Sequence, residues 1–303
     1  MRRVTHAGMA VLLVCLMLAC GDPGPPQGPV YSDVPVQGAA WQSLRLAVHP
    51  LHNPQKLLQA YGPLADYLNA RLDGVRIEIE ASNSYAHFET KYRAGEPDLI
   101  LPNPYQTIQA LGQGYRVIAE AGDSEDFRGL FIVRRDAGIH LPADLRGLLL
   151  AYPSPTALAA AMMPKLWLAR QGVDLQDEVG HRYVGSQESA ILSVYRGEAA
   201  VGVTWPPPWR AFQASHPEAA SELTPLWMTE PLINNSVMVS PRVSPALAAQ
   251  LQALLLDMHA HPDGQAALAG MQTARFHPAD DERYRQVVGA FLADYMMRVG
   301  ALP

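Results

Sequence analysis

The stretch LRLAVHPLHNPQKLLQAYGPLADYLNARL, residues 44–72, contains the pattern that decides the fold. It opens with a short apolar run, LRLAV, which has the length and composition of a buried strand. From residue 54 onward, apolar side chains recur at intervals of three and four positions, the spacing of one face of a helix. We therefore predict a strand over residues 44–48 and a helix over residues 54–72.

The same alternation of strand and helix recurs further along the chain. We predict strands over residues 75–80, 98–101, 145–153, 182–185 and 199–204, and helices over residues 85–93, 156–171 and 188–196, with a further helix that begins at Pro104. Strands that alternate with helices of this length are typical of βαβ units, whose strands are parallel. The sequence therefore predicts an α/β fold.

An internal similarity indicates that this α/β pattern occurs twice. Residues 92–100 (YRAGEPDLI) resemble residues 195–203 (YRGEAAVGV), and in each segment a helix ends near a glycine and a short buried strand begins. The order of elements around the two segments also matches. We therefore expect two similar α/β lobes.

Two strand-like segments flank the second set of elements, at residues 129–134 and 236–240. We expect these strands to be the crossings between the lobes. Lobe one is then formed by residues 43–134 together with residues 236–303, and lobe two by residues 135–235. The helical tail of the chain is expected to pack back on lobe one.

The N-terminus has the features of an export signal. A basic start is followed by a short apolar run over residues 11–18 and by the small residue Ala19, which predicts a signal peptide over residues 1–19. Residues 17–20 (MLAC) resemble a bacterial lipobox, which implies a lipid on Cys20 that anchors the protein to a membrane on the periplasmic side. The alternative is an ordinary signal peptide that happens to contain a cysteine.

The residues after this signal, 20–42, are rich in Pro and Gly and lack periodicity, which predicts a flexible tether. Cys15 and Cys20 are the only cysteines, so the exported chain would contain no disulfide and no cysteine nucleophile. Hydrophobic residues make up 49% of the chain, so the folded body can rely on its core instead.

Charge and motifs exclude several classes of function. The net charge of −6 disfavours a nucleic-acid partner. The sequence lacks the motifs of a nucleophilic serine, a phosphate-binding loop and a zinc protease. The histidine pairs in residues 49–52 and 259–261 have no Cys or carboxylate partner fixed by spacing. We predict no catalytic residue, no cofactor and no metal.

Candidate binding residues follow from the predicted topology, because ligands of open parallel sheets bind beyond the carboxyl ends of the strands. Six loops occupy this position: residues 49–53, 82–85, 102–105, 152–156, 185–189 and 204–206. Several carry Ser, Thr or Asn where a helix N-cap is expected, as in Asn103-Pro104 and Ser154-Pro155. None contains Lys or Arg, so an anion would be held by helix N-termini and neutral donors. The alternative is that these are ordinary caps without a ligand.

These segments resemble a known family, the phosphonate-type substrate-binding proteins of ABC importers, which are receptors for phosphate, phosphite and phosphonate. The resemblance runs from residue 44 to residue 239 and is carried by residues 44–72, 84–105, 143–175 and 184–203. It implies the two-lobed periplasmic-binding-protein fold, in which each lobe is a mostly parallel sheet flanked by helices and crossing strands join the lobes. It also implies ABC permease subunits as partners.

The resemblance also implies binding residues. Family tyrosines fall on Tyr85 and Tyr105, and the Ser/Thr turn that holds phosphoryl oxygens falls on Ser154 and Thr156. Together with the strand ends, this gives the candidate ligand-binding residues Tyr85, Asn103, Tyr105, Ser154, Thr156, Ser186, Gln187, Thr204 and Trp205. We expect Tyr105, Ser154 and Ser186 to face one shared cavity.

The chain departs from the family pattern at several of these places. Pro155 and Ala157 stand where Ser or Thr is usual, and Gln187 replaces the family's His. Ala200 or Val201 replaces an Asp at the start of the last strand of lobe two, and no acidic residue matches the one that holds a ligand amine in some members. Because an ammonium group would lack its partner, we expect a ligand other than an aminoalkylphosphonate.

We therefore predict a monomeric, lipid-anchored solute-binding protein that captures a small oxyanion of the phosphate, phosphite or phosphonate class by hinge closure. A less polar ligand that uses Trp205 is the alternative at the level of the ligand. At the level of function, the alternatives are a sensor lipoprotein that partners a membrane histidine kinase and an enzyme on the same fold.

Overall fold

The structure is a computed structural model that describes residues 41–303. The predicted signal peptide over residues 1–19 and the predicted lipidation site Cys20 lie outside the described residues. The predicted tether also lies outside them except for its last two residues, and Gln42 already begins the first strand.

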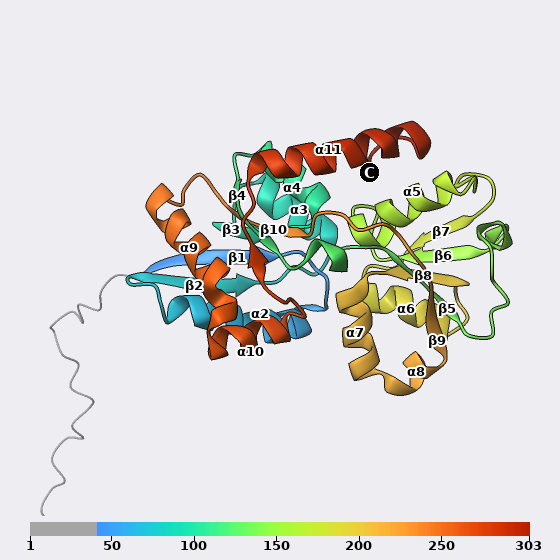
Figure 1. Ribbon diagram of the computed structural model, residues 1–303, viewed down its shortest axis with the longest axis horizontal. Helices are drawn as coiled ribbons and strands as arrows, with labels where there is room; N and C mark the ends of the chain where they lie inside the picture. The colour runs from blue at the N-terminus through green and yellow to red at the C-terminus, as the bar shows by residue number, and fades with distance from the viewer. Residues whose placement is uncertain (1–40) are drawn as a thin grey trace, which may run out of the picture. The chain divides into compact units, whose positions relative to one another are not determined.

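Within residues 41–303 the chain forms two sheets, each flanked by helices (Figure 1). The first sheet has the strand order β11-β4-β10-β3-β1-β2. Its strands are β1 (Gln42–Val48), β2 (Val75–Glu80), β3 (Leu99–Leu101), β4 (Arg116–Ala121), β10 (Asn235–Val239) and β11 (Phe276–His277). Strand β1 pairs in parallel with β2 and β3, whereas β10 is antiparallel to β3 and β4.

The second sheet has the strand order β7-β6-β8-β5-β9. Its strands are β5 (Leu130–Arg134), β6 (Leu149–Tyr152), β7 (Gly180–Tyr183), β8 (Val201–Thr204) and β9 (Leu223–Met228). Strand β6 pairs in parallel with β7 and β8, and β5 is antiparallel to β8 and β9. The two-lobed α/β fold expected from the sequence is confirmed.

Helices cover both sheets. They are α2 (Pro54–Asn69), α3 (Tyr85–Arg93), α4 (Pro104–Leu111), α5 (Met163–Arg170), α6 (Gln187–Tyr195), α7 (Pro206–Ser215), α8 (Pro217–Ser221), α9 (Pro245–Asp257), α10 (Pro262–Gly270) and α11 (Asp281–Arg298). No helix of the described part of the chain is long and apolar enough to cross a bilayer.

The strand and helix of the opening stretch pack as their patterns require. Leu46 and Val48 of β1 are buried in the same cluster as Leu57 and Leu64 of α2. Ala47, on the opposite face of β1, is buried in a second cluster. A parallel strand that is covered on both faces reads as a continuous apolar run, and residues 46–48 of β1 are such a run, whereas Arg45 before them is exposed.

Strand β5 lies elsewhere than expected. We assigned residues 129–134 to lobe one as a crossing, but β5 pairs with β8 and β9 and is therefore part of the second sheet. Strand β10, the other expected crossing, lies inside the first sheet. The chain passes between the sheets in the segments just before β5 and just before β10, residues 122–129 and 229–234.

The C-terminal helix α11 also differs from expectation, because it contacts both lobes rather than lobe one alone. It packs against α4 of the first lobe and α5 of the second (Figure 1). Asp294 of α11 forms an ion pair with Arg170 of α5, with 2.6 Å between Oδ2 and Nη2. The tail is thus a third connection between the lobes.

The helix predicted over residues 156–171 is interrupted. Residues Leu158–Met162 form a π-helical turn, and regular α-helix begins only at Met163. Pro164 has no N–H to donate to the carbonyl four residues earlier, so the α-helical ladder cannot continue through this point. The turn places Ala157 and its neighbours beside the gap between the lobes.

Candidate ligand-binding site

A narrow cavity lies between the two lobes. Its lining side chains come from both of them: His49, Tyr85, Asn103, Phe127, Ala157, Leu158, Ala159, Ala160, Gln187, Trp205 and Asn235. The open space is about 10 Å³, close to the minimum that one water molecule needs. The lobes are therefore in contact around this cavity, in a closed arrangement.

Three helices begin at the cavity wall, and each is capped by a side chain. Ser84 accepts a hydrogen bond from the backbone of α3, Asn103 from that of α4 and Ser186 from that of α6. A cap satisfies one of the free N–H groups of a first turn and leaves others available. Because the N-terminus of a helix carries a partial positive charge, three such ends give the cavity wall a positive potential without a charged side chain.

Gln187 connects the two lobes across the cavity. Its Nε2 donates to the hydroxyl oxygen of Tyr85 in lobe one, at 3.2 Å, and its Oε1 accepts from Thr204 Oγ1, at 2.9 Å. All three residues are buried. Burial raises the pKa of Tyr85, so its hydroxyl stays neutral and can donate to a ligand.

A second hydrogen bond joins the lobes at the same place. Asn103 Nδ2, at the start of α4, donates to the backbone oxygen of Thr156 at 2.9 Å. Asn103 is thus both a helix cap and a contact to the opposite lobe, which couples the position of α4 to the turn that precedes the π-helix.

The cavity wall is uncharged. His49 is the one titratable imidazole that lines it, and burial lowers its pKa to about 4. One side of the cavity is apolar, because the Trp205 and Phe127 rings meet edge to face with 5.4 Å between centroids. No group of three or more metal-ligating side chains occurs among residues 41–303.

Four of the residues predicted from the sequence meet in this cavity: Tyr85, Asn103, Gln187 and Trp205. Thr156 and Thr204 lie directly behind them, since each hydrogen-bonds a lining side chain. Six of the residues that were predicted from their positions at strand ends therefore lie in the cavity wall or directly behind it.

The other three predicted residues do not line the cavity, contrary to the expectation that they would share it. Tyr105 donates its hydroxyl to the backbone oxygen of Pro303, at 2.6 Å. Ser154 Oγ is 3.2 Å from Thr156 Oγ1. Ser186 caps α6 and donates to Ser189 Oγ, at 2.8 Å. Each of these hydroxyls is hydrogen-bonded to a nearby residue or to the C-terminal residue. The position of a residue at a strand end does not predict such a bond.

The candidate binding residues did not include the other seven that line the cavity: His49, Phe127, Ala157, Leu158, Ala159, Ala160 and Asn235. His49 directly follows β1, in the first of the six strand-end loops, but it was not among the candidate binding residues. Asn235 is the first residue of β10, which is antiparallel to its neighbours. The start of an antiparallel strand lies at the same edge of the sheet as the carboxyl ends of its neighbours, but only carboxyl ends were considered. Phe127 lies in a segment that joins the lobes, which sequence periodicity does not reveal.

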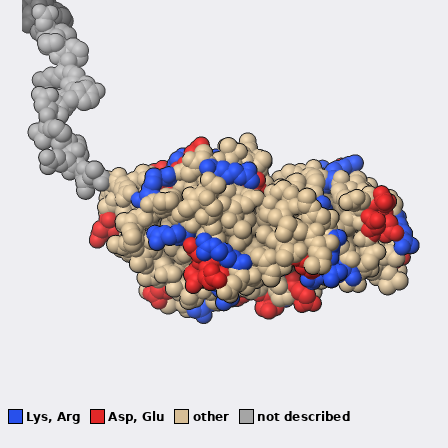
Figure 2. All heavy atoms as spheres, turned by 90° about the horizontal axis from the view of Figure 1, so that it is seen from above, with Lys and Arg blue, Asp and Glu red and all other residues tan. Residues whose placement is uncertain are grey.

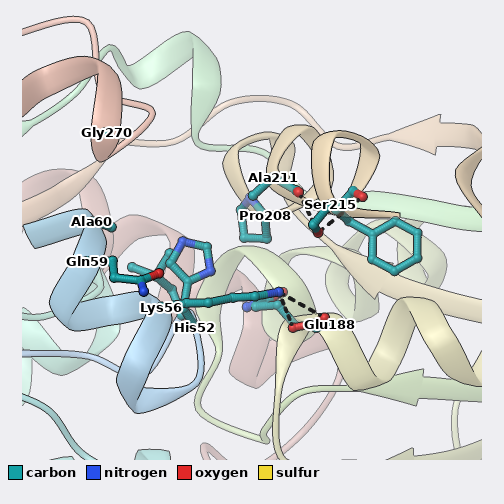
Figure 3. A pocket seen from close by; sticks show the side chains of 12 residues that line it. His52, Lys56, Gln59, Ala60, Glu188, Pro208, Ala211, Ser215 and Gly270 are labelled. Carbon is teal, nitrogen blue, oxygen red and sulfur yellow. Dashed lines mark hydrogen bonds and ion pairs between the residues drawn. The ribbon is translucent and has the colours of Figure 1, made fainter. Parts of the chain in front are cut away.

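A second pocket, of about 290 Å³, lies outside the cavity between α2, α6 and α7 (Figure 3). Gln187 lines both spaces. Lys56 reaches across this pocket from α2 to Glu188 of α6, with 3.0 Å between Nζ and Oε1. His52 also lines it, and its pKa is lowered to about 4 by burial and by the nearby Lys56.

A two-lobed α/β protein with a buried, uncharged cavity between its lobes has the architecture of a solute receptor. Residues 46–284 match the family described as "ABC transporter, phosphonate, periplasmic substrate-binding protein". The chain belongs to this family of periplasmic substrate-binding proteins. Members of the family are binding components of transporters rather than enzymes, and the family places the protein in the periplasm.

Solved structures share the fold. A binding protein component of an ABC phosphonate transporter from Pseudomonas aeruginosa superimposes with a TM-score of 0.75 at 16% identity, over 85% of this chain and 89% of that one. PhnD1 from Prochlorococcus marinus, solved in complex with methylphosphonate, gives 0.75 at 18% identity, over 85% and 98%. XAC2383 from Xanthomonas citri, bound to chloride ion, gives 0.67 at 24% identity, over 85% and 98%.

Proposed function

We propose that this protein captures a small oxyanion of the phosphate, phosphite or phosphonate class in the cavity between its lobes. The observation that carries the proposal is the convergence of the N-termini of α3, α4 and α6 on a buried space whose wall has no charged side chain. Backbone N–H groups and the hydroxyl of Tyr85 would hold the anionic oxygens.

Capture would proceed by hinge closure. The first turns of α3 and α4 belong to one lobe and that of α6 to the other, so a ligand between them contacts both lobes only when the lobes are closed. Such a ligand shifts the equilibrium toward the closed form by its differential affinity for that form. We propose the segments 122–129 and 229–234 as the hinge, since they join the sheets.

The uncharged cavity wall also bears on whether the ligand's substituent carries an amino group. Asp and Glu are absent from the described residues that line the cavity, and a buried ammonium group needs such a partner. The edge-to-face pair of Trp205 and Phe127 gives one side of the cavity an apolar wall, against which a hydrogen or a methyl group would pack. We therefore propose that aminoalkylphosphonates bind weakly.

For the protein's place in the cell, we propose a monomer held at the membrane by a lipid on Cys20, which delivers its ligand to ABC permease subunits. Acidic and basic side chains are interspersed over the face seen in Figure 2. That face has no extended basic region of the kind that binds nucleic acid. Labelling with a radioactive fatty acid tests the anchor, because Cys20→Ser should abolish both the label and recovery in the membrane fraction.

A sensor lipoprotein that presents its closed form to a membrane histidine kinase is the second candidate, and it would use the same cavity. Deletion of the gene distinguishes the two: loss of ligand uptake supports the importer, and intact uptake with lost transcriptional response supports the sensor. Incubation with each candidate ligand should yield no product if the protein is a receptor and not an enzyme.

Isothermal titration calorimetry with phosphate, phosphite, methylphosphonate and 2-aminoethylphosphonate tests the proposal as a whole. We expect one of the first three to bind tightest. Tightest binding of the amine would contradict the proposed ligand class, and no binding of any of the four would contradict the proposed function.

A further inference from the structure

One residue of the cavity wall has a fixed tautomer. His49 follows β1, is 2% exposed, and places its Nδ1 2.9 Å from the backbone oxygen of Leu101. A carbonyl oxygen can only accept, so Nδ1 carries the proton of this hydrogen bond. In a neutral imidazole the other nitrogen, Nε2, is then an acceptor.

His49 is neutral at physiological pH. Burial lowers its pKa to about 4, and the positive charge that His52 would carry lowers it further. Lys56 and Glu188 act on His52 rather than on His49 directly. Within residues 41–303, Nε2 of His49 has no hydrogen-bond donor as a partner, although the side chain lines the cavity.

A second polar side chain of the cavity is also uncommitted. Asn235 is 3% exposed, and its Oδ1 is buried without a hydrogen-bond partner among the described residues. Its backbone N–H donates to Asn234 Oδ1, its backbone oxygen accepts from Tyr284, and the residue lines the cavity. A buried polar atom without a partner is uncommon in folded proteins, and Asn235, which carries one, lines the same cavity as His49.

We propose that His49 Nε2 accepts a hydrogen bond from a protonated oxygen of the ligand. His49 would then be a specificity-determining residue, and the cavity would take the hydrogen-bearing monoanion of a phosphonic or phosphorous acid. The inference rests on the proposed function and deepens it by naming the ionic form of the ligand. Asn235 Oδ1 is a second acceptor in the same wall, so it would pair with a donor such as a water molecule or a second ligand O–H rather than with an anionic oxygen.

A hydrogen bond from the ligand to His49 Nε2 should make the protein prefer a phosphonate to a sulfonate. A phosphonate monoanion has one O–H that can donate to Nε2. A sulfonate of the same shape is fully ionised at neutral pH, so it has three acceptor oxygens and no donor. It would leave Nε2 unpaired and place an anionic oxygen against its lone pair, which should weaken binding by about 10- to 100-fold.

The test compares methylphosphonate with methanesulfonate by calorimetry on the wild-type protein, His49→Phe and His49→Gln. In the wild type we expect methylphosphonate to bind at least about 10-fold more tightly. Phenylalanine has no acceptor, so the ratio of the two affinities should fall toward one in His49→Phe. Glutamine can donate to the backbone oxygen of Leu101 and accept from the ligand, so His49→Gln should still prefer methylphosphonate to methanesulfonate. This variant is the control that separates loss of the acceptor from misfolding in His49→Phe.

Proton uptake provides a second readout. Well above the second pKa of methylphosphonate, titrations in buffers of different ionisation enthalpy should show uptake of about one proton per ligand bound, because the dianion must be protonated to enter. His49→Gln should keep this uptake. Its loss in His49→Gln would mean that His49 itself takes the proton, which would overturn the inference.

The failure of this inference can be told apart from that of the proposed function. Equal binding of methylphosphonate and methanesulfonate to the wild type would overturn the role of His49 and leave the receptor function standing. No binding of methylphosphonate, phosphite or phosphate would overturn the receptor function, and this inference with it.

Discussion

At the scale of single residues, Gln187 is the side chain on which the closed arrangement depends most directly. It hydrogen-bonds Tyr85 of the opposite lobe and Thr204 of its own. It also replaces the histidine that the family resemblance implies at this position. A carboxamide is both donor and acceptor but carries no charge, so the cavity stays neutral where a histidine could be protonated.

Replacement of Gln187 by Ala should weaken binding of the preferred oxyanion by about 10-fold, because Tyr85 and Thr204 each lose a buried partner. Calorimetry on the purified variant measures the change. Gln213→Ala is the matched control, since Gln213 lies exposed on α7 outside the cavity. Unchanged affinity in Gln187→Ala would contradict the assigned position of the ligand.

The two histidines after β1 predict how stability depends on pH. Burial lowers the pKa of both His49 and His52 from 6.5 to about 4. Below about pH 6.5 the unfolded chain therefore binds protons that the folded chain does not accept until about pH 4. The neutral form of these two histidines therefore does not reduce the free energy of unfolding above pH 6.5. As the pH falls from about 6.5 to about 4, protonation of the unfolded chain lowers the free energy of unfolding.

At pH 5.5 we expect each histidine to reduce the free energy of unfolding by about 1 kcal/mol relative to pH 7.5. Urea unfolding at the two pH values measures the difference. The variant with both His49→Gln and His52→Gln should lose less stability on acidification than the wild type. Equal losses in the two proteins would show that other groups are responsible.

At the scale of elements, Gly202 sets how closely α6 lies on β8. A Cβ at this position would clash with the backbone oxygen of Ala190 and would lie 2.9 Å from Val194 Cγ2, both on α6. Because Gln187 is the first residue of α6, the close approach of helix and strand also fixes where Gln187 meets the cavity.

We expect Gly202→Ala to destabilise the protein by about 1–3 kcal/mol, since the helix must move or the backbone must distort. Gly289→Ala is the control, because nothing lies within 4 Å of a Cβ at that helical position, and it should stabilise by up to about 1 kcal/mol. Thermal unfolding of both variants checks the prediction. A Gly202→Ala protein as stable as the wild type would contradict the close packing.

Elements with local signals could be predicted from the sequence. The strand over residues 75–80 and the helix over residues 85–93 have the predicted bounds, because period-two and period-3.6 patterns are properties of the segment itself. The strand expected over residues 182–185 lies at Gly180–Tyr183 instead. The helix expected over residues 156–171 was wrong in its first half, because its apolar pattern hides the effect of Pro164 on the hydrogen-bond ladder.

What could not be predicted depends on contacts between distant segments. The sheet to which β5 belongs is decided by pairing with β8 and β9, and no feature of its own sequence encodes those partners. The same holds for the site. Tyr85, Asn103 and Gln187 follow from strand ends and caps, whereas Asn235 reaches the cavity through the antiparallel insertion of β10 into the first sheet.

At the scale of the whole molecule, the two lobes are held together by the cavity contacts, by the packing of α11 on both lobes and by an ion pair at the outer pocket. Lys56 of α2 and Glu188 of α6 belong to different lobes and remain 40% and 30% exposed. His216 Nε2 lies 3.4 Å from the same carboxylate. The Lys56–Glu188 pair therefore favours the closed form, but solvent limits its strength.

We expect Lys56→Met to weaken ligand binding by up to about 5-fold at low salt, which corresponds to about 1 kcal/mol for a partly exposed pair. The effect should disappear at high salt, because screening removes the contribution in both proteins. Arg76→Met is the control, since Arg76 pairs with Glu78 within one strand. A loss that is the same at both salt concentrations would argue against an electrostatic contact between the lobes.

The oxyanion should lie in the small uncharged cavity between the lobes and not in the larger outer pocket that contains Lys56. A crystal structure of the protein with methylphosphonate tests it most directly. We expect the phosphonate group at the first turns of α3, α4 and α6, within hydrogen-bond distance of Tyr85 and Gln187. A phosphonate bound beside Lys56 and His52, with the inner cavity unchanged, would contradict it.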